Sequence, residues 1–191
     1  RFDIAQTVMM HDAGELAPDD VTTFGVLQQL VHASESLFVI PAVVELLARR
    51  DHSRAELERK LRRKGFSPTA CEDAVQYARE RGYQSDRRFA ESWIRGMMRG
   101  SGRSRTYLYT GLTTRGVMGD VATEALDEYE QDNPGCFGAA LQEQAERVVR
   151  RIASTAEPPD YHGLTPRQQR TVISRLMSRG FSMKEIREHF A

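Results

Sequence analysis

The sequence predicts an all-α protein: a tandem repeat of three three-helix modules of the helix-turn-helix kind, elongated or curved, after a short N-terminal appendage. Three observations predict this fold class. Residues that favour helices are abundant and strongly β-favouring stretches are scarce. One helix-ending pattern occurs three times along the chain, and apolar residues recur at helical spacing between the copies.

The repeated pattern reads Leu-x-x-basic-Gly-apolar, and its last residue is Phe in two copies and Val in one. It occurs at 61–66, 112–117 and 176–181, although the first copy has Lys where the others have Arg. A basic residue in the last turn complements the negative end of the helix dipole. The glycine can adopt the left-handed conformation of a C-cap, and the apolar residue after it can fold back onto the helix. Each copy therefore predicts a helix end.

Helix-start signals lie on both sides of these endings. Short polar side chains can cap the first turn of a helix, and a Glu or Gln three residues later completes a capping box. Ser53 with Glu56 is one such pair, and Pro after a cap also fits the first helical position. The predicted caps are Ser53, Ser67, Asp86, Thr165 and Ser182, with a weaker start at Gly119-Asp120.

A third helix is predicted before each pair, from apolar residues within 43–47, 89–97 and 141–152. The modules are therefore expected at 42–85, 86–136 and 137–191, after an appendage at 1–41. In the appendage, residues 2–4 are consistent with a strand end and 18–32 with an amphipathic helix. The middle helix, 104–115, is less regular because Gly111 inside a helix costs about 1 kcal/mol relative to Ala.

The formal net charge is zero, but its distribution is uneven. Residues 1–48 have a net charge of −6, residues 49–115 of +9 and residues 116–191 of −3. A basic region of this kind attracts polyanions even in a neutral molecule. The alternative, that these are ordinary solvated helix faces, remains open at this point.

Two cysteines are too few for a disulfide framework, so we expect buried or half-buried thiols in a reducing compartment. The longest apolar run, 37–44, contains Pro41 and is far shorter than the ~20 residues of a membrane span. No signal peptide is visible. These features predict a cytoplasmic protein without a membrane contact.

Catalytic, metal and cofactor motifs were not found. The five histidines have no ligand-like spacing, and no nucleophile has an evident base nearby. The stretch Gly100-Ser101-Gly102-Arg103 lacks the spacing of a phosphate loop. We therefore expect a protein that is not an enzyme and that has no cofactor and no metal.

Two basic groups are candidates for binding a partner or DNA. One is concentrated before Gly65, and the other brackets residues 100–102, close to Tyr107 and Tyr109, which could stack on bases. The candidate residues are Arg54, Arg59, Lys60, Arg63, Lys64, Arg95, Arg99, Arg103 and Arg105. A solvated helix end and a solvated turn with two surface tyrosines are the corresponding alternatives.

Three stretches, 46–61, 86–93 and 179–187, resemble the RecX family: LLARRDHSRAELERKL is similar to its first module, DRRFAESW to the opening of its second and RGFSMKEIR to its C-terminal end. The resemblance covers about residues 42–190 in the right order. The stretch Tyr107–Gly111 departs from the family pattern, in which a more charged, better helix-forming sequence is expected.

The resemblance implies a negative regulator that lodges in the groove of the RecA–single-stranded DNA filament. Such a protein inhibits the ATPase, strand-exchange and co-protease activities of RecA and so acts in DNA repair, recombination and the SOS response. It implies RecA as partner, single-stranded DNA mainly together with RecA and more weakly alone, and a monomer. The alternative is a helix-turn-helix protein that acts on DNA directly. The helices after the glycines, 71–81 and 121–129, are mostly apolar or acidic, which does not favour base reading.

Overall fold

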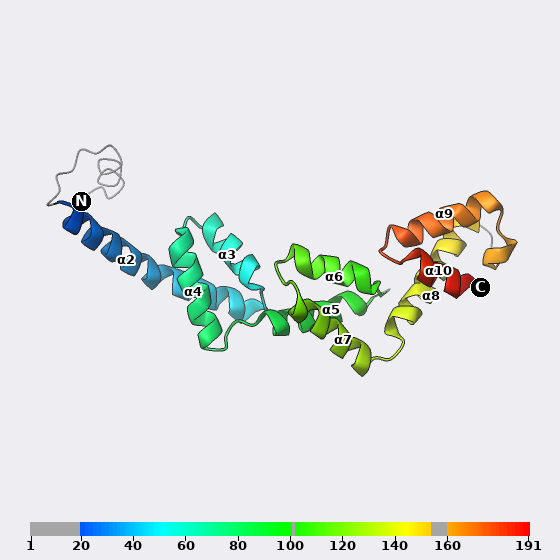
Figure 1. The fold of residues 1–191 in the computed structure, drawn as a ribbon, viewed down its shortest axis with the longest axis horizontal. Coiled ribbons are helices and arrows are strands. Elements are labelled where there is room, and N and C mark those ends of the chain that lie inside the picture. The colour runs from blue at the N-terminus through cyan, green and yellow to red at the C-terminus, as the bar shows by residue number, and fades with distance from the viewer. Residues whose placement is uncertain (1–19, 101, 154–159) are drawn as a thin grey trace. The chain divides into compact units, whose positions relative to one another are not determined.

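The structure, a computed structural model, describes residues 20–100, 102–153 and 160–191, with side chains described from residue 34 onward. Over these residues the protein is all-helical, as predicted (Figure 1). The helices are α2 (Asp20–Arg49), α3 (Arg54–Arg63), α4 (Pro68–Glu80), α5 (Asp86–Met98), α6 (Arg105–Thr114), α7 (Asp120–Asp132), α8 (Cys136–Ala153), the 3-10 helix η1 (Tyr161–Gly163), α9 (Pro166–Met177) and α10 (Met183–Phe190).

Each helical triplet has its own hydrophobic core. Leu57 and Leu61 of α3 are buried with residues of α2 and α4. Leu108 and Leu112 take the matching places between α5 and α7, and Leu176 lies in the core that α8, α9 and α10 share. Burying a leucine side chain contributes about 1.5 to 3 kcal/mol. The apolar positions predicted at helical spacing are therefore the ones that hold each triplet together.

The three predicted helix endings share one backbone geometry. Gly65, Gly116 and Gly180 have φ angles of 93°, 83° and 85°, in the left-handed region. The amide of the next residue donates to the carbonyl of the leucine five positions before it, at 3.4, 3.0 and 3.3 Å in chain order. The glycine amide donates to the carbonyl three positions before it each time. These bonds define the Schellman motif, which satisfies carbonyls that a helix end otherwise leaves unpaired.

Most of the predicted helix starts are confirmed. Ser67 accepts from the Ala70 amide, and Thr165 and Ser182 form complete capping boxes. The cap of α5 is Ser85 rather than Asp86, which is the first helical residue. Sequence alone could not separate two adjacent residues that are both good caps.

The middle helix α6 forms in spite of Gly111, and the structure explains the glycine. A Cβ atom there would overlap the ring of Trp93, which lies directly against the backbone of α6. The guanidinium of Arg115 also lies over the Trp93 ring, 4.7 Å from the ring centroid. Glycine thus permits the close packing of α5 against α6.

α2 is one helix across the predicted boundary between residues 41 and 42. Pro41 lacks an amide hydrogen, so the helix loses a bond there. Val39 and Val43, on either side of Pro41, are both 1% exposed and belong to the core with α4, which holds the helix together across the proline. The predicted strand end at 2–4 lies outside the described residues, and the module boundaries remain a prediction.

Two compact units make up the described chain. One contains the residues up to Arg49 together with Leu57–Tyr83, and the other contains Arg50–Glu56 and Gln84–Ala191. None of the described helices has both the length and the apolar character needed to cross a bilayer.

Within the second unit, one contact occurs twice. The hydroxyl of Ser53 donates to the carbonyl of Arg115 at 2.5 Å, and the hydroxyl of Ser104 donates to the carbonyl of Arg179 at 3.2 Å. Each acceptor is the basic residue that precedes a Schellman glycine. The helix-ending motif is therefore also the surface on which a helix start is packed.

The glycines make this contact possible. A Cβ atom on Gly116 would overlap the Cβ of Ala55, and one on Gly180 would lie 2.6 Å from the Ser104 hydroxyl. Around Gly65, in the other unit, no atom lies within 4 Å of such a Cβ among the described residues. Gly116 and Gly180 thus serve two purposes, the left-handed turn and the close approach.

Candidate functional site

The basic residues at the end of α3 form a group that is exposed except for Lys60, which is half-buried. Leu61 is fully buried, and the charged side chains surround it on the solvent side. Arg62 and Lys64 have acidic neighbours, Glu72 at 3.6 Å and Glu45 at 4.0 Å. Arg59 and Arg63 are exposed and have no ion-pair partner among the residues that the structure describes. These two arginines are the members of the group most available to a phosphate or a carboxylate.

The second predicted group is distributed over α5 and the segment before α6. Arg95 pairs with Glu91 of its own helix at 3.6 Å, and Arg99 is exposed at the end of α5. Arg105 contacts Asp127 at 2.5 Å and Glu130 at 3.2 Å. A phosphate would have to displace two carboxylates to reach Arg105, so the structure favours a structural role for it.

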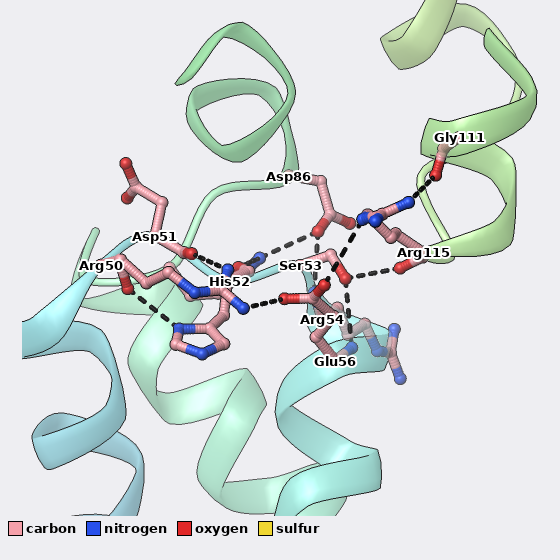
Figure 2. A network of polar contacts seen from close by, with 10 residues as sticks. Arg50, Asp51, His52, Ser53, Arg54, Glu56, Asp86, Gly111 and Arg115 are labelled. Carbon is pink, nitrogen blue, oxygen red and sulfur yellow. Dashed lines mark hydrogen bonds and ion pairs between the residues drawn. The ribbon is translucent and has the colours of Figure 1, made fainter. Parts of the chain in front are cut away.

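Arg54, at the start of α3, is held through its backbone amide. Its amide donates to Asp86 Oδ1 at 2.8 Å (Figure 2). Gln84 Nε2 donates to the same carboxylate at 3.0 Å and to the carbonyl of His52 at 3.3 Å. His52 Nδ1 lies 2.9 Å from the Arg50 carbonyl. These bonds fix the segment 50–56 on the start of α5.

A second part of the same network is ionic. The carboxylate of Glu56, 13% exposed, lies 3.1 Å from Arg50 and 3.8 Å from Arg115. Arg115 also donates to the Gly111 carbonyl at 2.8 Å (Figure 2). The predicted capping box is therefore only half formed: Ser53 accepts from the Glu56 amide, but the Glu56 carboxylate pairs with arginines instead.

A third basic cluster was not among the predicted site residues, apart from Arg103. It lines a pocket of about 520 Å³ between the start of α6, α8 and the end of α9. Its arginines are Arg103, Arg147, Arg151, Arg175 and Arg179. Four of the arginines form two pairs with i, i+4 spacing: Arg147 and Arg151 on α8, and Arg175 on α9 with Arg179 just after its end. This i, i+4 spacing was the sequence signal for the cluster, but only the fold shows that the two pairs face the same pocket.

The positive charges of the arginines in this pocket destabilise the charged form of Arg179. Burial lowers the pKa of Arg179 below its usual value, and Arg151, Arg103, Arg175 and Arg147 lower it further. The Nη1 atom of Arg179 is buried and has no hydrogen-bond partner among the described residues. Such a group is stabilised by any anion that enters the pocket.

Other site chemistry finds no support in the described part of the chain. No group of three or more His, Cys, Asp or Glu side chains there could hold a metal ion. Cys71 is a buried free thiol and Cys136 a half-buried one, as expected from the sequence. Burial raises the pKa of both thiols, which makes them poor nucleophiles at neutral pH.

Family models match two parts of the chain. Residues 42–77 match the model described as "RecX, first three-helix domain", and residues 85–126 match "RecX, second three-helix domain". These matches cover α3 and α4 with the end of α2, and then α5, α6 and the first half of α7.

Curated relatives named "Regulatory protein RecX" extend the match over most of the chain. The protein of Stenotrophomonas maltophilia (strain K279a) is 38% identical over 142 residues, which is 74% of this chain and 78% of the relative. The protein of Chromohalobacter salexigens is 34% identical over 149 residues, 78% of this chain and 88% of the relative. That of Haemophilus influenzae (strain KW20 / Rd) is 31% identical over 147 residues, covering 75% and 86%.

Solved structures agree in fold. The crystal structure of RecX from Lactobacillus salivarius has a TM-score of 0.64 at 19% identity and covers 82% of this chain and 95% of its own. A second, titled "Crystal structure of regulatory protein RecX", has a TM-score of 0.67 at 16% identity and covers 89% and 75%. The sequence matches show the family, and the repeated three-helix architecture agrees with them: the chain belongs to the RecX family of regulatory proteins.

Proposed function

We propose that the chain is a negative regulator of the RecA recombinase. It binds the RecA–single-stranded DNA filament as a cytoplasmic monomer and inhibits the ATPase, strand-exchange and co-protease activities of RecA, without catalytic chemistry of its own. Membership of a family of regulatory proteins, at 38% identity to a curated member, is the observation that carries this proposal.

The basic end of α3 supports an anionic partner. Arg59 and Arg63 are exposed without an acidic neighbour among the described residues, so their guanidinium groups are accessible to an anion. A filament of RecA on DNA presents phosphates and acidic protein surface to such a group. Lys60, half-buried, and Lys64, exposed and 4.0 Å from Glu45, lie next to these arginines in the sequence.

The alternative, a helix-turn-helix protein that reads DNA, receives less support. The helices that would enter a groove are those after the glycine turns, and two of the three, α4 and α7, expose several carboxylates. α7 exposes Glu124, Asp127 and Glu130, and α4 exposes Glu72 and Asp73. Carboxylates in these positions repel backbone phosphates, so these helices are unsuited to the major groove.

The ATPase of RecA on single-stranded DNA tests the proposal. Titration with this chain should inhibit hydrolysis at substoichiometric ratios to RecA, because one bound regulator affects filament growth beyond its own site. Unchanged hydrolysis at equimolar protein would refute the proposed function. Footprinting on a genomic library should show no preferred site, and a strong preferred site would favour the alternative.

Charge reversal on α3 tests the surface. The variant Arg59→Glu, Arg63→Glu, Lys64→Glu should bind the filament more weakly and inhibit less, at unchanged helix content. A matched control reverses three exposed charges elsewhere: Arg79→Glu, Arg167→Glu, Lys184→Glu. Equal loss of inhibition in both variants would assign the effect to total charge and reject the α3 surface.

A further inference from the structure

The arginine pocket of the second unit has the character of a binding site rather than a solvated surface. It has a volume of about 520 Å³, and Gln144, one of its lining residues, is 4% exposed. Its lining includes no carboxylate among the described residues. Arg147 pairs with Glu143 of its own helix at 2.6 Å, and Arg151, Arg175 and Arg179 have no ion pair with a carboxylate of the described residues.

Gathering these guanidinium groups opposes folding unless an anion joins them. The guanidinium groups that line the pocket repel one another several times more strongly than they would in water, because the pocket partly excludes solvent. The Nη1 atom of Arg179 is buried without a hydrogen-bond partner among the described residues, so no hydrogen bond there offsets its desolvation. Arginine presents planar donors that match phosphate oxygens two at a time.

A single strand of nucleic acid fits the surroundings better than an acidic peptide does. Tyr107, 42% exposed, lies beside the pocket: its Cβ atom is 3.2 Å from the Cβ position of Gly180, the residue after Arg179. The guanidinium of Arg103 lies 5.4 Å from the Tyr107 ring centroid. An exposed aromatic ring next to a cationic pocket is the arrangement that binds unpaired bases by stacking and the backbone by charge.

We infer that the pocket between α6, α8 and α9 binds the phosphodiester backbone of single-stranded DNA, with an adjacent base on Tyr107. This site is separate from the α3 surface. It acts without RecA, so its failure and the failure of the proposed function are distinguishable by experiment.

The test measures fluorescence anisotropy of a labelled oligothymidylate with the full chain and no RecA. The pocket variant is Arg151→Gln with Arg175→Gln, two exposed members. The control is Arg150→Gln with Arg187→Gln, which removes the same charge from exposed positions of α8 and α10 that do not line the pocket. At about 50 mM salt the pocket variant should bind about tenfold more weakly or worse, and its log–log salt slope should fall by about 1.4 units.

The control variant should keep an affinity within about threefold of the unmodified chain, because it removes no pocket contact. Equal weakening in both variants, or none in the pocket variant, would overturn the inference. So would a lower melting temperature of the pocket variant, since removing like charges from a repulsive cluster should leave stability unchanged or raise it.

Two competitors distinguish the source of the anion. Inorganic phosphate at the same phosphate concentration should compete weakly, because it offers one group and no base; competition equal to that of DNA would reduce the pocket to a small-anion site. An oligoglutamate peptide should displace DNA less well than unlabelled oligothymidylate. Stronger displacement by the peptide would overturn the assignment to DNA in favour of an acidic protein segment.

Discussion

Replacing Gly180 by Ala tests whether the helix-ending motif is also a packing surface. The residue has φ +85°, and an added Cβ would lie 2.6 Å from Ser104 Oγ and 3.1 Å from the Tyr107 amide nitrogen. Neither atom can withdraw easily: Ser104 is 1% exposed, caps α6 and donates to the Arg179 carbonyl. The substitution therefore adds a clash to the ordinary cost of a left-handed Ala.

The magnitude follows from these contacts. A non-glycine residue in the left-handed region costs about 1 to 2 kcal/mol. Displacing Ser104 weakens its bond to Arg179 and its cap on α6, which adds about 1 to 3 kcal/mol. Gly135, in the same unit, has φ +75° and nothing within 4 Å of its Cβ position. Gly135→Ala should thus cost only the first contribution.

The assay is urea unfolding followed by tryptophan fluorescence. Trp93 is the single tryptophan and packs on the core of α5–α7, so its emission reports on the second unit. Gly180→Ala should lower the free energy of unfolding by about 2 to 5 kcal/mol and Gly135→Ala by about 1 to 2. Equal losses would refute the packing argument. Ser104→Ala should make Gly180→Ala less costly, because the overlapped hydroxyl is then gone.

Three further predictions concern single side chains. Gly111→Ala should destabilise the second unit by about 2 kcal/mol or more in the same urea assay, although Ala is the better helix former, because its Cβ overlaps Trp93; a stabilised variant would contradict this packing. Burial raises the pKa of Cys71 above 9.0, so the unmodified chain should lose stability as pH rises past 9.0, where the unfolded thiol ionises. The difference in unfolding free energy between the unmodified chain and Cys71→Ala, measured by circular dichroism, should then shrink. A constant difference would contradict the burial. Tyr107→Glu, which supplies the kind of carboxylate that Glu56 provides for Arg115, should raise the melting temperature and weaken oligothymidylate binding at least about tenfold; unchanged binding would remove Tyr107 from the site.

The sequence could predict the features that depend on neighbours along the chain. The Schellman turns at Gly65, Gly116 and Gly180 need only residues within six positions, and their pattern was recognisable for that reason. The caps at Thr165 and Ser182 are equally local, since each bonds to a residue three positions later. Local signals repeated three times were enough to predict the helical triplets.

Contacts between distant residues could not be predicted in this way. Ser53 and Arg115 are 62 positions apart, and Ser104 and Arg179 are 75. Nothing in the glycine motif itself distinguishes Gly65, which has open space around its Cβ position, from Gly180, which has none. The role of Gly111 was misjudged for the same reason, because its partner Trp93 lies on another helix.

The repeat also explains why the arginine pocket lies where it does. Counting from the serine cap, Glu56 and Tyr107 occupy the same position, three residues after Ser53 and Ser104. In the earlier junction this position supplies the carboxylate that lies 3.8 Å from Arg115. In the later one it supplies an aromatic ring, so the equivalent basic residue, Arg179, lacks that carboxylate and is surrounded instead by arginines that lower its pKa. One change of residue type at a repeated position thus separates a closed ion pair from an open cationic pocket, while the hydroxyl-to-carbonyl bond that holds the helices stays the same.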